Sequence, residues 1–101
     1  MTANVETLIA TLDRIVALLK RHGEEHWSWW LRHDAELLRR DDLAGLDHLL
    51  ASFGGMGSFN DVYLCPENGA KIASHEVRPV NEELQRLQAL AHEQGHACRT
   101  T

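Results

Sequence analysis

The stretch that decides the fold is VETLIATLDRIVALL, residues 5–19. Its apolar residues recur at steps of three and four, so they share one stripe of an α-helix. The charged side chains of this region fall outside the stripe, and Gly23 is a good stop signal just beyond it. The sequence therefore predicts a helix over residues 3–22. Its apolar stripe consists of Val5, Leu8, Ile9, Leu12, Ile15, Val16 and Leu19.

The same periodicity predicts two more helices in the first half of the chain. One runs from Glu24 or Glu25 to Arg40, and the next follows a cap at Asp41 or Asp42 and ends at Gly54. The expected buried face of the second helix consists of Trp27, Trp30, Leu31, Leu37 and Leu38. That of the third helix consists of Leu43, Leu46, Leu49, Leu50 and Phe53.

The second half of the chain is less regular. Residues 61–74, DVYLCPENGAKIAS, place a turn at 66–69 between short β-prone runs and predict either a small β-hairpin or an irregular excursion. After Pro79, a cap near Asn81 predicts a final helix that buries Leu84, Leu87, Leu90 and Ala91. The fold class expected is mainly α, a compact bundle of about four helices with a glycine-rich loop and a short β-hairpin as an option.

Composition limits the classes of function. The chain has 101 residues, 44% of them hydrophobic, which fits a single domain over residues 1–101. A formal net charge of −5 disfavours nucleic acid as a partner, and no apolar run reaches the roughly 20 residues that a membrane span needs. The N-terminus lacks a secretory pattern, and two cysteines make no disulfide framework. We therefore expect a cytoplasmic protein.

Two histidine motifs resemble metalloprotease signatures. HEQGH, residues 92–96, matches the zincin pattern, and HGEEH, residues 22–26, matches its inverted form. On the final helix His92 and His96 lie away from the leucine stripe and should face solvent, and Gly23 should break the helix in the other motif. No third ligand is identifiable for either motif. We expect no metal and no cofactor; the alternative is a metal-dependent hydrolase using His92, Glu93 and His96.

The loop ASFGGMGSFNDVYL, residues 51–64, has a structural and a functional interpretation. In the structural one, Gly54, Gly55 and Gly57 allow the chain to turn, while Ser58 and Asp61 cap the amides of a following turn. Met56 and Phe59 would then fold back onto the core. In the functional one, a ligand or partner contacts Ser58, Asn60 and Asp61. The loop is neither a nucleophile elbow nor a phosphate-binding loop.

Two segments carry a resemblance to a family. HGEEHWSWWL, residues 22–31, and LLASFGGMGSFNDVYL, residues 49–64, resemble small bacterial proteins of unknown function that share a GGMGS-x-ND core. The resemblance covers residues 20–64 and implies a bacterial cytoplasmic protein, with no catalytic residue to carry over. The matching loop positions are Gly54, Gly55, Met56, Gly57, Ser58, Asn60 and Asp61.

Trp29 is the residue that core packing does not explain. It projects opposite to Trp27 and Trp30, among charged side chains, which is typical of an interface anchor. The alternative is that residues 50–80 cover it.

We expect a small acidic protein-interaction module, of the immunity or antitoxin type, that binds a protein partner such as a toxin encoded nearby. The alternatives are the hydrolase and a regulatory domain that binds a small ligand at the glycine-rich loop. Helix one could also pair in a homodimer.

Overall fold

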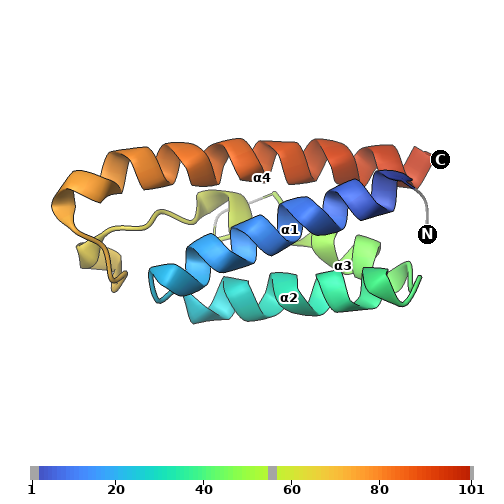
Figure 1. The fold of residues 1–101 in the computed structure, drawn as a ribbon, viewed down its shortest axis with the longest axis horizontal. Coiled ribbons are helices and arrows are strands. Elements are labelled where there is room, and N and C mark those ends of the chain that lie inside the picture. Colours follow the sequence, from blue (N-terminus) through green and yellow to red (C-terminus); the bar gives the residue numbers. More distant parts are fainter. Residues whose placement is uncertain (1–2, 55–56, 101) are drawn as a thin grey trace.

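The computed structural model of the protein describes residues 3–54 and 57–100. Its four α-helices are α1 (Ala3–Arg21), α2 (Glu25–Arg39), α3 (Ala44–Ala51) and α4 (Val77–Thr100). Between α3 and α4 the chain forms three single 3₁₀ turns, η1 (Phe59–Asp61), η2 (Pro66–Asn68) and η3 (Ser74–Glu76). The prediction of a mainly α bundle with about four helices is confirmed (Figure 1).

The core lies where the helices meet. α1 packs against both α2 and α4, and the short α3 likewise contacts both of these helices (Figure 1). The stripe of α1 faces this core, with Leu8, Leu12, Ile15 and Leu19 fully buried. Burying each such side chain stabilises the fold by about 1.5–3 kcal/mol. The stripe is therefore used inside the domain. None of the helices in the described chain has a stretch long and apolar enough to cross a membrane.

The junctions between the first three helices follow local rules. Gly23, at a φ of +76°, ends α1 in the left-handed region that favours glycine. The Glu24 carboxylate then caps α2 by accepting a hydrogen bond from the Trp27 amide at 2.7 Å. Before α3, the Asp42 carboxylate accepts one from the Ala44 amide at 2.9 Å, but the residue in the cap position is Leu43, one residue after the predicted Asp41 or Asp42. α3 ends at Ala51, three residues before the predicted stop at Gly54.

The start of the last helix was predicted wrongly. α4 begins at Val77, so Pro79 lies in its first turn, where a missing amide hydrogen costs nothing. Asn81 is buried inside the helix and caps nothing there. Its side chain hydrogen-bonds the backbone of Leu64, accepting from the amide and donating to the carbonyl, both at 2.8 Å. The helix therefore starts four residues earlier than the asparagine suggested.

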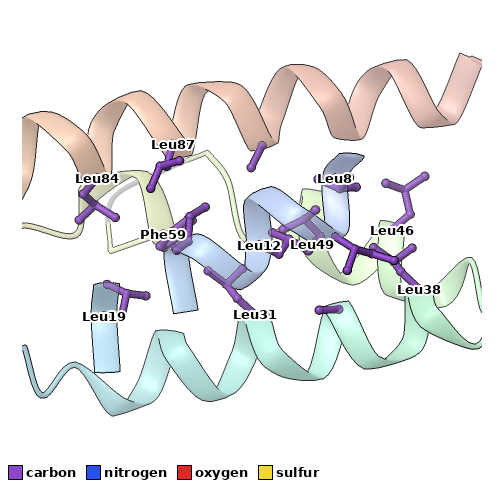
Figure 2. Close-up of a cluster of buried hydrophobic side chains, with 14 of the residues drawn as sticks. Leu8, Leu12, Leu19, Leu31, Leu38, Leu46, Leu49, Phe59, Leu84 and Leu87 are labelled. Carbon is purple, nitrogen blue, oxygen red and sulfur yellow. The ribbon is translucent and has the colours of Figure 1, made fainter. Parts of the chain in front are cut away.

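The β-hairpin is absent from the described residues, and the irregular excursion is what the chain adopts. Residues 66–68 form η2 instead of a hairpin turn. The flanking backbone has other partners: Leu64 pairs with the Asn81 side chain, and the Lys71 amide donates to the carbonyl of His22 at 2.8 Å. Phe59 from this segment joins the same buried cluster as the leucines of all four helices (Figure 2).

Candidate functional site

Trp29 lies on the outer face of α2. Its side chain is 60% exposed, so residues 50–80 do not cover it as the alternative interpretation required. The indole stacks on the imidazole of His33, one turn further along the helix, with ring centroids 5.9 Å apart and planes 5° from parallel. Beside it, Lys20, Glu25 and Arg32 surround a shallow hollow that Trp29 also lines. The indole of Trp29 thus faces solvent, stacks on one imidazole and has charged side chains beside it.

Behind this face lies a set of packed rings and one buried acid. His33 meets His48 of α3 edge-to-face at 5.8 Å, and His48 stacks on Trp30 at 4.1 Å. The Nδ1 of His48 hydrogen-bonds the carboxylate of Asp34, whose side chain is fully buried. Rings from two helices therefore connect the exposed Trp29, through His33, to the α2–α3 interface.

The buried carboxyl group of Asp34 has a raised pKa and an oxygen without a hydrogen-bond partner among the described residues. Its burial raises the pKa to about 6, although the hydrogen bond and charge of His48 and the charge of His33 act to lower it. Its second oxygen, and the indole nitrogen of Trp30 one turn earlier, are buried without a hydrogen-bond partner among the described residues. This cluster was not predicted, but a signal existed. Asp34 occupies the stripe position between Leu31 and Leu38, where an apolar residue is expected.

A groove of about 300 Å³ separates the start of α2 from the segment after the glycine-rich loop. Its aromatic lining comes from Trp27 and Tyr63, and its acidic lining from Glu24 and Asp61, with Ser58 at the wall. No basic residue lines it within the part of the chain that the structure describes. The groove therefore offers aromatic faces and negative charge together, which suits a positively charged group.

The loop polar residues act differently from the prediction. Asp61 accepts a hydrogen bond from the Gly57 amide at 2.8 Å, and Asn60 accepts one from the Gly54 amide at 3.1 Å. Both therefore stabilise the loop that precedes them, not a following turn. Ser58 donates to the Asn60 side chain and makes no side-chain cap of η1, so its predicted capping function is wrong.

The loop glycines fit the structural interpretation where they are described. Gly54 and Gly57 have φ values of +97° and +80°, a region that residues with a Cβ rarely adopt. Gly55 and Met56 lie outside the described residues. Phe59 is fully buried, as expected. The loop thus turns on its glycines and is anchored by its phenylalanine.

The predicted partner-binding residues do not form one site. Trp29 lies on the outer face of α2, whereas Ser58 and Asp61 line the groove. Asn60 lines a separate hollow beside Gln85, Gln88 and His92 of α4. Two separate candidate surfaces therefore remain. One is the groove. The other is the Trp29 face, which consists of Trp29, His33 and the charged residues beside them.

The two histidine motifs lie in different environments. His22 is buried and donates from Nδ1 to the carbonyl of Lys71 at 2.9 Å, so it tethers the irregular segment to the end of α1. His92, Glu93 and His96 are exposed on α4, as predicted for the two histidines. Over residues 3–54 and 57–100 no group of three potential metal ligands is found. The described chain therefore offers no site of the zincin type.

Comparison with known proteins places the chain in a family. The chain has no significant match to a curated protein or to a solved structure. The model of a domain of unknown function, DUF6966, matches residues 20–73, which is just over half of the 101 residues. That range contains α2, α3, the glycine-rich loop and every residue that lines the groove. The chain therefore belongs to the DUF6966 family, whose function is unknown.

Proposed function

We propose that this protein is an interaction module that binds another protein through the Trp29 face, meaning Trp29, His33 and the charged residues beside them. The observation that carries the proposal is the 60% exposure of Trp29. The opposite face of the same helix already packs in the core, so core packing does not explain this tryptophan. Covering the rest of this indole would contribute about 2–4 kcal/mol to a complex. The indole already stacks on His33, which lowers the conformational entropy that Trp29 would lose on binding.

The surroundings of Trp29 favour a protein over other partners. Lys20, Glu25 and Arg32 form a rim of mixed charge, and a polar rim around an apolar anchor is typical of protein interfaces. The net charge of −5 makes nucleic acid a poor partner and a basic protein a good one. The partner that we infer is therefore a protein.

The more specific proposal, that the protein neutralises a toxin, rests on the sequence. A small acidic protein with an exposed aromatic anchor suits one that neutralises a partner, as immunity proteins and antitoxins do, and the partner would then be a toxin encoded nearby. We also infer that the GGMGS-x-ND residues, Gly54 to Asp61, mark the family, and that the protein is bacterial and cytoplasmic.

Photo-crosslinking in the native cell tests where the partner binds. A photoreactive amino acid at position 29 should crosslink to one protein, which mass spectrometry then identifies. The matched control is the same amino acid at Leu43, which was predicted to be buried but is 64% exposed just before α3. Crosslinking to a second copy of this chain would indicate a homodimer. Equal products from both positions, or none from position 29, would remove the support for this face.

A second function is favoured by the groove, namely binding of a small cationic ligand. Its two carboxylates, Glu24 and Asp61, each have one oxygen engaged by a backbone amide. Among the described residues neither carboxylate forms an ion pair. Trp27 and Tyr63 add aromatic faces that attract cations. A ligand with an ammonium or guanidinium group fits this combination.

Titration with simple cations tests the groove. Butylammonium and butylguanidinium should shift the indole NMR signal of Trp27 saturably, whereas neutral butanol should not. Asp61→Asn should weaken this binding, because it removes the charge but keeps an oxygen for the Gly57 amide. Glu36→Gln, an exposed acid on α2 outside the groove, is the control. Identical titrations for Asp61→Asn and wild type would reject this function.

A further inference from the structure

Two imidazoles converge near the C-terminal end of α4. His92 and His96 lie one helical turn apart and both are exposed. Their Nε2 atoms are 3.2 Å apart, and their ring centroids are 4.5 Å apart. The two Nε2 atoms lie within hydrogen-bonding distance of each other, so one metal ion could contact both.

This separation fits joint coordination of one metal ion. Zinc–imidazole bonds are about 2.0–2.1 Å long, so two such nitrogens lie about 2.9 Å apart at a right angle and about 3.3 Å apart at a tetrahedral angle. The observed 3.2 Å falls between these limits. We propose that His92 and His96 chelate one divalent transition-metal ion through their Nε2 atoms, at a site independent of the Trp29 face and of the groove.

The pair is held in place from two sides. The rings of Phe53 and His92 pack against each other at a steep angle, with centroids 4.9 Å apart, so one side of that imidazole is in contact with the protein. Between the two histidines, Gly95 is buried against α3: a Cβ there would lie 2.9 Å from Leu50 Cδ2. This turn of α4 is therefore packed on α3, so the backbone that carries the two imidazoles is fixed.

The donor set decides which metals bind. Imidazole nitrogens suit Cu²⁺, Ni²⁺ and Zn²⁺, whereas Mg²⁺ and Ca²⁺ require oxygen ligands. Glu93 does not complete a third position, because the described residues contain no group of three metal ligands. Water or a donor from another molecule occupies the remaining positions. The site is thus an open two-histidine chelate and differs from the zincin centre that the HEQGH motif resembles.

Calorimetric titration of the metal-free protein with NiCl₂, ZnCl₂ and MgCl₂ tests the proposal. We expect one Ni²⁺ or Zn²⁺ per chain and no binding of Mg²⁺. His92→Ala and His96→Ala should each reduce the affinity for Ni²⁺ at least tenfold. His75→Ala, which removes an exposed histidine of η3, should leave the affinity unchanged. Both target histidines are exposed, so circular dichroism should show that the variants remain folded.

A double variant separates geometry from the number of histidines. The variant H96A/A97H keeps two imidazoles but moves the second one residue along α4, out of line with His92. It should bind Ni²⁺ as weakly as His96→Ala. The proposal is overturned if the wild type binds neither Ni²⁺ nor Zn²⁺ up to millimolar concentration. It is equally overturned if His92→Ala and His96→Ala bind as tightly as the wild type.

Discussion

At the scale of single residues, Asp34 balances opposing effects. Burial raises its pKa from 3.8 to about 6, against the lowering effects of His48 and His33. Because the folded-state pKa lies above the ordinary value, the folded protein holds this proton more tightly than the unfolded chain between about pH 4 and pH 6. The ionised carboxylate therefore costs stability above pH 6, and the cost disappears as the pH falls through this window.

The Asp34→Asn variant should reveal this dependence. The amide has the shape of the protonated acid but does not titrate. We expect the free energy of unfolding of the wild type, relative to Asp34→Asn, to increase as the pH is lowered from 7 to 4. Urea unfolding of both proteins across this range measures the difference. A difference that stays constant or falls with decreasing pH would contradict the account.

Gly45 permits the close contact between α2 and α3 that brings His48 to Asp34. A Cβ at this position would lie 2.8 Å from Leu37 Cβ and 2.9 Å from the Asp34 carbonyl oxygen. Both of these atoms are fixed by the backbone of α2, so Gly45→Ala must push the helices apart. We expect it to lower the free energy of unfolding by about 1–3 kcal/mol, measured in urea.

Gly95→Ala is the matched control for Gly45→Ala. Its Cβ would meet only the end of the Leu50 side chain within 3 Å, at Cδ2, and that side chain can rotate. Alanine also favours the helix by up to about 1 kcal/mol. Gly95→Ala should therefore remain within about 1 kcal/mol of the wild type. Equal destabilisation by both substitutions would show that the tight backbone contact is not the cause.

At the scale of elements, the irregular segment between α3 and α4 depends on side chains of α4. Asn81 makes three hydrogen bonds, two to the backbone of Leu64 and one to the carbonyl of Val77. Gln88 donates to the carbonyl of Phe59 at 2.8 Å. With these partners the segment satisfies backbone groups that a β-hairpin would have paired between strands.

Asn81→Ala should therefore destabilise the fold more than an ordinary surface change. It leaves the amide and carbonyl of buried Leu64 without partners, which should cost about 2–4 kcal/mol in the free energy of unfolding. Gln85→Ala, an exposed change one turn further along α4, should cost less than about 0.5 kcal/mol. Chemical denaturation of both variants compares them. Similar values for the two variants would refute the anchoring function of Asn81.

These elements also show what the sequence could and could not predict. The four helices were predictable, because each buries a stripe with helical spacing and Gly23 marks the first boundary. The start of α4 was not predictable. The sequence does not distinguish an asparagine that caps a helix from one that, like Asn81, hydrogen-bonds a residue seventeen positions earlier in the chain. The side of α2 on which Trp29 lies followed from its helical angle, but its exposure did not, because residues 50–80 could have covered it. The Asp34–His48 contact depends on how closely two helices approach, and periodicity does not encode that distance.

At the scale of the whole molecule, the candidate surfaces divide between two parts of the chain. The Trp29 face and the groove lie within residues 20–73, the range that matches the family. The histidine pair lies on α4, outside that range. α4 and most of α1 also lie outside it, although they supply much of the core. Protein binding and groove binding are therefore the functions to test across the family, and metal binding the one to test in this chain.

The affinity of the purified partner complex, with Trp29→Ala compared with wild type, tests the central claim most directly. We expect the dissociation constant to rise at least tenfold, while the free energy of unfolding of the unbound protein changes by less than about 1 kcal/mol. Leu43→Ala, at another exposed hydrophobic residue, should leave the affinity unchanged. An unchanged dissociation constant for Trp29→Ala would contradict the claim that the Trp29 face binds the partner.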